Sequence, residues 1–243
     1  MTKKTSSRFI MGVHCLEEVI SHSPERIVAI YAIESALKRN FLTSVKHLVK
    51  LVRKDELTKM VQSDSHQGLV AKVKEKKAIF LKEFIESIQD RPTSCLLLLD
   101  NINDPQNLGT ILRSADCFKV DAVIWSKNRG ADITPIVTKT SSGASELVNT
   151  IKVSNLAETV VYLKKQGYET IAAHADKEAD SLFRYQFGPK VAFIMGSEGK
   201  GIQPLVLKRT DQSLYIPMYG QVDSLNVSQA TAVFLSHFAK AIY

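Results

Sequence analysis

The sequence predicts an α/β fold built on a parallel sheet with helices on both faces. Three observations in the second half of the chain lead to this prediction. Residues 95–99 are all apolar, which is typical of a strand buried on both faces. Short apolar runs of this kind alternate with segments of helical periodicity. Short polar stretches separate strand from helix, as expected where each strand crosses over to a parallel neighbour.

The first part of the chain predicts a smaller α/β unit. Its strands are expected from apolar runs, and residues 68–74 in addition alternate between apolar and polar side chains. Its helices are expected from apolar residues spaced on one face. In order, we expect a strand at 8–11, a helix at 14–20, a strand at 26–33, a helix at 43–50, a short strand at 51–53, a helix at 55–62 and a strand at 68–74.

A change in composition separates the two parts. Residues 74–77 are charge-dense, residues 80–88 form a weakly amphipathic segment, and Arg91–Pro92 interrupts the chain. We therefore expect a domain at 1–76, a linker at 77–92 and a second domain at 93–243. The alternative is one continuous domain that carries a surface helix.

The second part predicts a regular series of elements. Strands are expected at 95–99, 122–125, 149–153, 170–173, 191–195 and 214–218, and helices at 107–118, 134–142, 156–166 and from 226 to the end. Pro135 suits the first turn of its helix and Gly167 the end of another. Asn226 is a good N-cap residue, and Gln229 follows at the spacing of a capping box.

Composition narrows the classes of function. The net charge of +7, from 32 basic and 25 acidic residues, mildly favours a polyanionic partner. We expect no membrane partner, because no apolar run approaches the roughly 18 residues that span a bilayer. The three cysteines lack metal-ligand spacing, so we expect no metal site. Their odd number suggests a reducing compartment, and we expect the protein in the cytoplasm.

Three polar loops that follow strands carry the candidate site residues. Asn107 and Arg113 lie six residues apart near the start of one helix, which we interpret as roughly similar faces. An arginine there could bind a phosphate or stabilise an oxyanion, and the alternative is a solvated helix residue. Glu198 lies between two glycines after the strand at 191–195; a turn carboxylate is more often simply solvated. Ser224 and Asn226 could equally be helix caps.

Together these loops resemble a known family. The segments NLGTILR, IMGSEGKGI and IPMYGQVDSLNVSQA are similar, in order and spacing, to the three motifs of the SpoU (TrmH) family of RNA ribose 2′-O-methyltransferases, part of the SPOUT superfamily. The segments FIMGVHCLEEVI and SHQGLVAKV resemble the ends of a ribosomal-protein-L30-like substrate-binding domain found in one branch. This pairing of domains is similar to that of family members that methylate a guanosine of 23S rRNA, so the resemblance implies this activity.

The resemblance implies a fold and a set of roles. It implies a deep trefoil knot at the C-terminal end, binding of S-adenosylmethionine (SAM) in the knot, and a homodimer. Carried over by position, Gly196, Ile216 and Leu225 would contact the cofactor, and Ser224 and Asn226 would shape its pocket. Arg113, Asn107 and Glu198 match the polar motif residues; Arg113 would stabilise the alkoxide that attacks the methyl group, and the other two would hold the geometry.

The resemblance leaves other functions open. A tRNA 2′-O-methyltransferase of the same family is the nearest alternative, and a non-catalytic RNA-binding assembly factor is another. A nicotinamide-dependent oxidoreductase is disfavoured, because the first strand of the second domain is not followed by a glycine fingerprint. Basic residues in the first domain would grip rRNA, unless they form a solvated face; they are Lys3, Lys4, Arg8, Arg26, Lys38, Arg39, Lys46, Lys50, Arg53 and Lys54.

Overall fold

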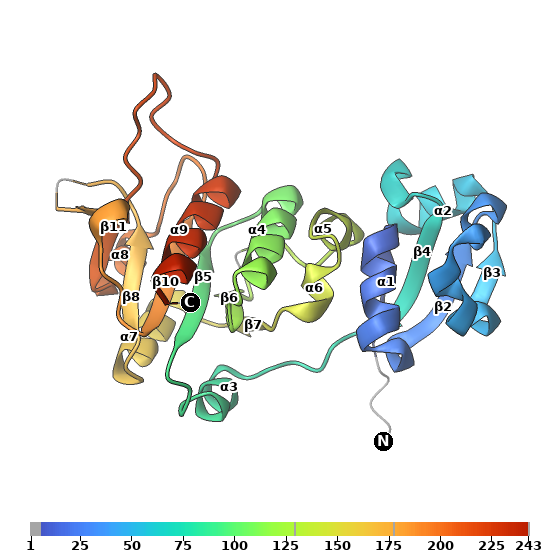
Figure 1. Cartoon of the computed structure of the whole chain (residues 1–243), viewed down its shortest axis with the longest axis horizontal. Helices are drawn as coiled ribbons and strands as arrows, with labels where there is room; N and C mark the ends of the chain where they lie inside the picture. Colours follow the sequence, from blue (N-terminus) through green and yellow to red (C-terminus); the bar gives the residue numbers. More distant parts are fainter. Residues whose placement is uncertain (1–5, 129, 177, 243) are drawn as a thin grey trace. The chain divides into compact units, whose positions relative to one another are not determined.

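The structure is a computed structural model of the 243-residue chain, and it describes residues 6–128, 130–176 and 178–242. The chain forms two compact units (Figure 1). The first unit contains residues 1–77 and 132–147, and the second contains residues 78–131 and 148–243. We describe each unit by itself.

The first unit is built on a small mixed sheet. Its elements are β1 (Ser7–Met11), α1 (Val13–His22), β2 (Ile27–Ala32), β3 (Val49–Leu51), α2 (Lys54–Val61), β4 (Leu69–Lys74), α5 (Pro135–Thr140) and α6 (Ala144–Leu147). The strand order is β1-β4-β2-β3, with β4 antiparallel to both β1 and β2, and β3 parallel to β2. Successive side chains of β1 enter different apolar clusters, Ile10 with α1 and Met11 with α2. The sheet is therefore covered on both faces.

One predicted helix of this unit has different bounds. The sequence predicts a helix at 43–50, whereas a 3-10 helix covers Asn40–Leu48 and β3 begins at Val49. The apolar residues Leu42, Val45 and Leu48 are spaced by three, and residues three apart eclipse one another in a 3-10 helix. Val45 also departs from helical geometry, with φ −117° and ψ 17°.

The segment 132–147 packs within the first unit, although we expected residues 134–142 to belong with the second. The backbone N–H of Met11 donates to Thr138 Oγ1 at 3.2 Å. The Glu146 carboxylate is buried and forms ion pairs with Arg8 and, at 2.9 Å, with Arg26. Burial lowers the pKa of the neighbouring Lys76 to about 8. Buried charges of this kind are stable only when paired, so the segment is fixed to this unit.

The second unit contains a parallel sheet. Its elements are α3 (Leu81–Ser87), β5 (Ser94–Asp100), α4 (Pro105–Cys117), β6 (Ala122–Ser126), β7 (Thr150–Val153), α7 (Leu156–Lys165), β8 (Glu169–Ala173), β9 (Asp180–Ser181), β10 (Lys190–Gly196), α8 (Pro204–Arg209), β11 (Gln212–Tyr215) and α9 (Val227–Ile242). The strand order is β7-β6-β5-β10-β8-β11-β9, and each pairing is parallel. This confirms the predicted α/β class with a parallel sheet.

Helices cover both faces of this sheet. On one face, Leu96, Leu98 and Ile194 pack with buried residues of α3, α7 and α8. On the other face Phe193 contacts Phe234 and Phe238 of α9, with ring centroids 5.6 and 5.8 Å apart. Helices α4 and α9 lie side by side there (Figure 1). The two neighbouring strands β5 and β10 are therefore fixed by helices on both faces, and so are the starting points of the loops that follow them.

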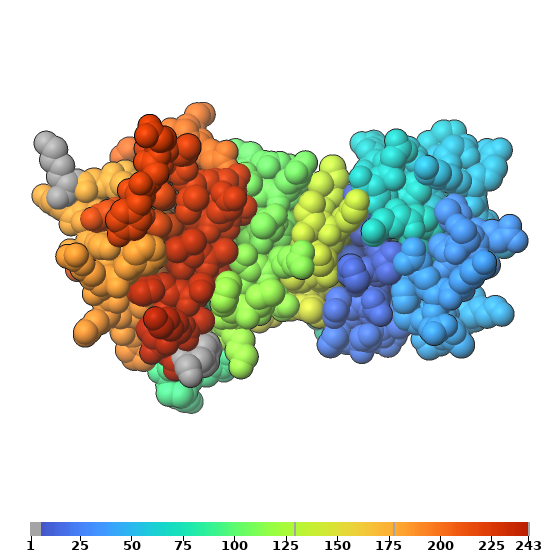
Figure 2. Space-filling view, turned by 45° about the horizontal axis from the view of Figure 1, so that its top comes forward, coloured from blue at the N-terminus to red at the C-terminus, as the bar shows by residue number. Residues whose placement is uncertain are grey.

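The last connection of the second unit is long and open. The predicted strand at 214–218 is β11, which ends at Tyr215 and lies next to the edge strand β9. Residues 216–226 then form a loop that projects from the unit (Figures 1 and 2). Tyr219 in this loop is 90% exposed and Val222 is 71% exposed. The loop is thus the least enclosed of the three motif segments.

Candidate functional site

Three polar loops meet at the carboxyl edge of the parallel sheet. They connect β5 to α4, β10 to α8 and β11 to α9. Because β5 and β10 are paired in parallel, with Gly196 opposite Asp100, their loops leave the sheet at the same edge. In open α/β sheets this is where ligands bind.

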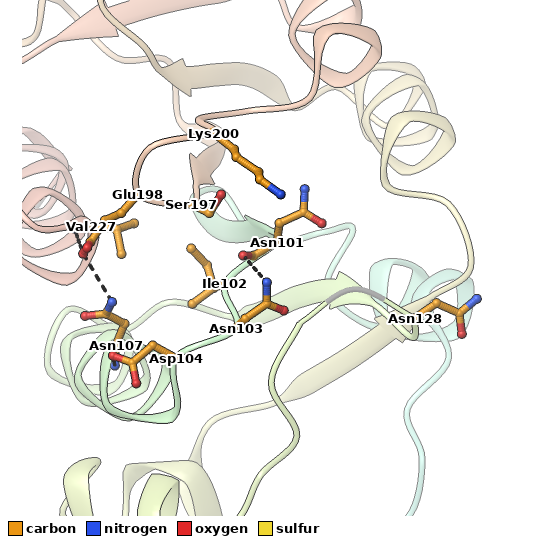
Figure 3. A pocket seen from close by; sticks show the side chains of 10 residues that line it. All are labelled: Asn101, Ile102, Asn103, Asp104, Asn107, Asn128, Ser197, Glu198, Lys200 and Val227. Atoms are coloured by element: carbon orange, nitrogen blue, oxygen red, sulfur yellow. Dashed lines mark hydrogen bonds between the residues drawn. The ribbon is translucent and has the colours of Figure 1, made fainter.

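A single carboxylate joins the three loops. Glu198 Oε1 accepts hydrogen bonds from Asn107 Nδ2 at 3.3 Å and from Asn226 Nδ2 at 2.5 Å. It also accepts from the backbone N–H of Val227 at 3.4 Å. Asn226 Nδ2 donates in addition to Asn107 Oδ1 at 3.0 Å. Figure 3 shows Glu198 facing Asn107, with a dashed line for the hydrogen bond between them. The sequence alone left open that the Glu198 carboxylate is simply solvated. In the structure it links the three loops instead.

Helix starts hold both asparagines in place. Asp104 is the N-cap of α4, and its carboxylate accepts from the backbone N–H groups of Gln106 and Asn107 at 3.1 and 3.3 Å. Asn226 precedes α9, and its Oδ1 accepts from the backbone N–H of Ser228 at 2.8 Å. The predicted capping role of Asn226 is confirmed. The same side chain thus caps a helix with its oxygen and binds Glu198 with its nitrogen.

The loop after β10 is tightly folded. Gly201 N donates to Ser197 O at 2.8 Å, and these two residues form an antiparallel bridge. A Cβ atom at Gly196 would lie 2.4 Å from the backbone carbon of Gly201. The buried carboxylate of Asp100 fixes the far end of the loop, because it accepts from Gln203 N at 2.7 Å and Gln203 Nε2 at 2.6 Å. Only glycine fits at position 196.

Substitution of Gly196 should destabilise this loop. For Gly196→Ala we expect a loss of about 1–3 kcal/mol in the free energy of unfolding, because the added carbon forces the packed backbone apart. Gly220→Ala is the matched control, since a Cβ there meets nothing within 4 Å. Urea denaturation of both variants checks the prediction. Equal midpoints for the two would contradict it.

Two cavities flank the Glu198 link. One has a volume of about 570 Å³ and is lined by Ala173, Met195, Gly196, Ser197, Glu198, Gly199, Gly201, Ser224, Leu225, Asn226, Val227 and Ala230. The other has a volume of about 710 Å³ (Figure 3) and is lined by Asn101, Ile102, Asn103, Asp104, Asn107, Asn128, Ser197, Glu198, Lys200 and Val227. Ser197, Glu198 and Val227 line both cavities. These residues form a shared wall, and both volumes suit a small organic ligand.

Four of the five predicted cofactor-binding residues line the smaller cavity, and the fifth does not. Gly196, Ser224, Leu225 and Asn226 all line the smaller cavity. Its wall mixes apolar side chains with glycines, which suits a flat ligand held by packing and by backbone groups. Ile216 is partly buried in the segment after β11 but lines neither cavity.

Arg113 does not join the Asn107 network. The interpretation that the two residues share a face is wrong, because six residues along an α-helix turn by 600°, which leaves them about 120° apart. Arg113 is exposed and has no hydrogen bond or ion pair within the described part of the chain. Sequence reasoning also missed individual residues of the larger cavity, among them Asn101, Asn103 and Lys200. The sequence did hold a signal for them, because all three are polar residues that follow the end of β5 or β10.

Two kinds of site are absent from the residues that the structure describes. No group of three or more histidine, cysteine, aspartate or glutamate side chains could hold a metal ion there. In the same residues, no helix has both the length and the apolar character that crossing a membrane requires.

Models of known protein families match both parts of the chain. A model of the SpoU rRNA Methylase family matches residues 94–236. A second model, RNA 2′-O ribose methyltransferase substrate binding, matches residues 9–78. The first match contains the three loops of the site, and the second covers most of the first unit.

Individual relatives match over nearly their full length. The 23S rRNA (guanosine-2′-O-)-methyltransferase RlmB of Pasteurella multocida is 34% identical over 235 residues, which are 94% of this chain and 96% of the relative. RlmB of Haemophilus influenzae is 33% identical with the same coverage. The fold is similar to that of the SpoU methyltransferase AviRb of Streptomyces viridochromogenes, solved with AdoMet, with a TM-score of 0.79, 19% identity and coverage of 96% and 90%. Since the larger family match spans more than half of the chain and contains the three joined loops, the chain belongs to the SpoU rRNA Methylase family.

Proposed function

We propose that the protein transfers the methyl group of SAM to the 2′-oxygen of a guanosine in 23S rRNA. The relatives that match 94% of the chain carry this activity in their names. The observation that carries the proposal is the Glu198 link, which joins the three motif loops between two ligand-sized cavities. In the reaction an O–C bond forms as the S–C bond breaks. The 2′-OH gives its proton to solvent water, and the sulfur keeps the bonding electron pair and leaves as a neutral thioether.

The smaller cavity is the proposed SAM site. Gly196, Leu225, Ser224 and Asn226 line it. Ile216 does not line it and would contact SAM only if the loop 216–226 moved towards the cavity. Bound there, the cofactor supplies an electrophilic methyl group. The proposed trefoil knot would place the loops after β10 and β11 around this cavity, and the resemblance supports that arrangement. No metal is required for such a displacement.

Arg113, Asn107 and Glu198 are the proposed catalytic set. Arg113 would stabilise the developing alkoxide, because guanidinium keeps its charge and donates hydrogen bonds without acting as a base. Asn107 and Glu198 would hold the loops that bring ribose and methyl donor together. Since Arg113 lies about 120° round α4 from Asn107 and lines neither cavity of its own chain, it must swing towards the ribose or act on a second copy. The proposed homodimer supplies that second copy.

The first domain, residues 1–76, is the proposed rRNA-binding domain. Residues 77–92, expected as a linker to a catalytic domain at 93–243, fall almost entirely within the second unit, and residues 132–147 pack with the first. The match of the first domain to a substrate-binding model supports its role. Several of its basic residues are already engaged: Arg8 and Arg26 pair with Glu146, and Arg53 pairs with Asp55 and Glu56. Lys3 and Lys4 lie outside the described residues. The exposed Lys38, Lys46 and Lys50 have no ion pair among the described residues, so they are free to bind phosphate.

Removing these three lysines should weaken RNA binding through loss of charge. For the triple change Lys38→Gln, Lys46→Gln and Lys50→Gln, we expect the slope of log affinity against log salt to fall by about 2, since each lost phosphate contact contributes roughly 0.7 to 0.9. The affinity for SAM should not change. Filter binding of transcribed 23S rRNA over a range of KCl concentrations measures the slope. An unchanged slope would show that these side chains form only a solvated face.

Methylation of separated RNA fractions tests the proposed function. Purified protein is incubated with radiolabelled SAM and with 23S rRNA or tRNA from a strain that lacks its gene. We expect label in 23S rRNA, at the ribose of one guanosine. Label in tRNA would favour the tRNA alternative. Binding of rRNA without any binding of SAM would favour the non-catalytic assembly factor. We also propose a cytoplasmic location, where rRNA is made available.

A further inference from the structure

The larger cavity has a lining unlike that of the proposed SAM site. Its ten lining residues include four asparagines, from three different segments of the second unit: Asn101, Asn103, Asn107 and Asn128. Its volume of about 710 Å³ lies within the range of small-molecule sites. Amide side chains both donate and accept hydrogen bonds, so they suit the mixed edge of an unpaired base.

Some polar side chains of this cavity already have hydrogen-bond partners within the described part of the chain, and others have none. The carboxylate of Asp104 caps α4, and that of Glu198 links the three loops. The side chains of Asn101, Asn128 and Lys200, by contrast, have no hydrogen bond within the described part of the chain. Asn103 donates from Nδ2 to the backbone oxygen of Asn101 at 3.2 Å. The engaged groups build the walls, and the free ones remain for a ligand.

Positive charge in the cavity comes from one side chain, beside the two engaged carboxylates of Asp104 and Glu198. Lys200 is the single cation among the described residues that line it. Its side chain extends from the loop after β10 towards Asn101 (Figure 3). Its backbone N–H donates to Glu198 O at 3.0 Å, which ties the base of this side chain to the tight loop. An ammonium on a flexible stem, beside the four asparagines of this cavity, is suited to a phosphate.

The position of the cavity defines what it can hold. Ser197, Glu198 and Val227 line both cavities, so the two cavities adjoin along these residues. Methyl transfer requires the attacking oxygen and the methyl carbon to approach to about 3–3.5 Å in line. A ribose in the larger cavity can meet that condition with a donor in the smaller cavity only along this shared border.

Building on the proposed function, we propose that the larger cavity is the acceptor site, which takes the target nucleotide unstacked from the RNA. Lys200 pairs with the phosphate of that nucleotide, and the amides of Asn101 and Asn128 bind the edge of its base. The ribose lies against the wall made by Glu198. Lys200 is thus a substrate-binding residue whose charge has no role in holding SAM.

A salt-dependent kinetic comparison tests the assignment of Lys200. For Lys200→Ala, we expect the KM for transcribed 23S rRNA to rise about tenfold, with the Kd for SAM unchanged within twofold. The slope of log KM against log KCl should fall by about 0.7 to 0.9, the share of one phosphate contact. Lys200→Arg should restore the slope. Lys165→Ala, which removes an exposed lysine at the end of α7, is the matched control and should behave as the wild type.

A second variant tests the base contact separately. Asn101 has φ +61°, a conformation that glycine adopts without strain, so Asn101→Gly removes the amide and keeps the backbone. We expect a KM for rRNA raised about fivefold, with an unchanged salt slope, because no charge is lost. A parallel rise in the Kd for SAM would show that the variant acts through the loops and would overturn the base contact.

The outcomes separate this inference from the function it builds on. If the wild type methylates 23S rRNA while Lys200→Ala matches Lys165→Ala in KM and slope, the acceptor site is wrong and the proposed function stands. A Kd for SAM that rises in Lys200→Ala would also overturn the assignment. If the wild type transfers no methyl group to rRNA, both proposals fall.

Discussion

Arg113→Ala should bind SAM with normal affinity and lose methyl transfer by about 100- to 1000-fold in kcat. The size follows from the usual effect of removing one group that stabilises a developing oxyanion. Binding of SAM should be spared, because Arg113 lines neither cavity and is about 120° round α4 from Asn107. Single-turnover transfer to 23S rRNA and calorimetric titration of SAM measure the two properties independently.

A second arginine provides the comparison for this variant. Arg184 is also exposed and also lacks an ion pair in the described residues, but it lies in the short 3-10 helix before β10. Arg184→Ala should keep wild-type kcat. Retained turnover in Arg113→Ala would remove Arg113 from the catalytic set. Lost binding of SAM would instead mean that the residue supports the fold of the site.

Glu146→Gln should lower the free energy of unfolding of the first unit by about 3–5 kcal/mol. The side chain of Glu146 is 1% exposed, and those of its partners Arg8 and Arg26 are 18% and 12% exposed. Removing the carboxylate charge leaves two guanidinium groups close together without their counterion, in a place that water barely reaches. Hydrogen exchange of the backbone amides of β1 and α5 locates the loss, since a chain of two units need not unfold in one step.

The matched control is an ion pair of similar geometry on the surface. Glu158 accepts from Arg209 Nη1 at 2.6 Å, but its side chain is 63% exposed. Glu158→Gln should cost no more than about 1 kcal/mol, because water already solvates both partners. If the two substitutions had equal effects on their own units, the burial of Glu146 would not be what makes its pairing important.

The sequence allowed most of the second unit to be predicted because its signals are strong and local. The apolar run of β5 and the asparagine cap of α9 each specify an element by themselves. The family resemblance drawn from three motifs is confirmed by the family match. Packing partners were harder to predict. Apolar periodicity showed that residues 134–142 are buried on one side, but it does not say against which surface, and they pack against the first unit.

The candidate site shows the same division. Asn107, Glu198 and Asn226 could be singled out because polar residues after parallel strands converge at one edge. Gly196 lines the smaller cavity, and its lack of a side chain also admits the backbone of Gly201. The separation of Arg113 from Asn107 could have been predicted from the helical repeat of 100° per residue. That the side chains of Lys200 and Asn101 line one cavity becomes visible only in the folded structure, where the loops come together.

The grouping of residues 132–147 with the first unit changes how the two units are connected. The chain passes from one unit to the other after Lys77, after Ala131 and after Leu147. A nick by a protease between the units at any one of these places would leave two covalent tethers intact. Removing residues 1–76 by truncation would therefore cut only one of the three connections, and it would strip α5 and α6 of the surface on which they are buried.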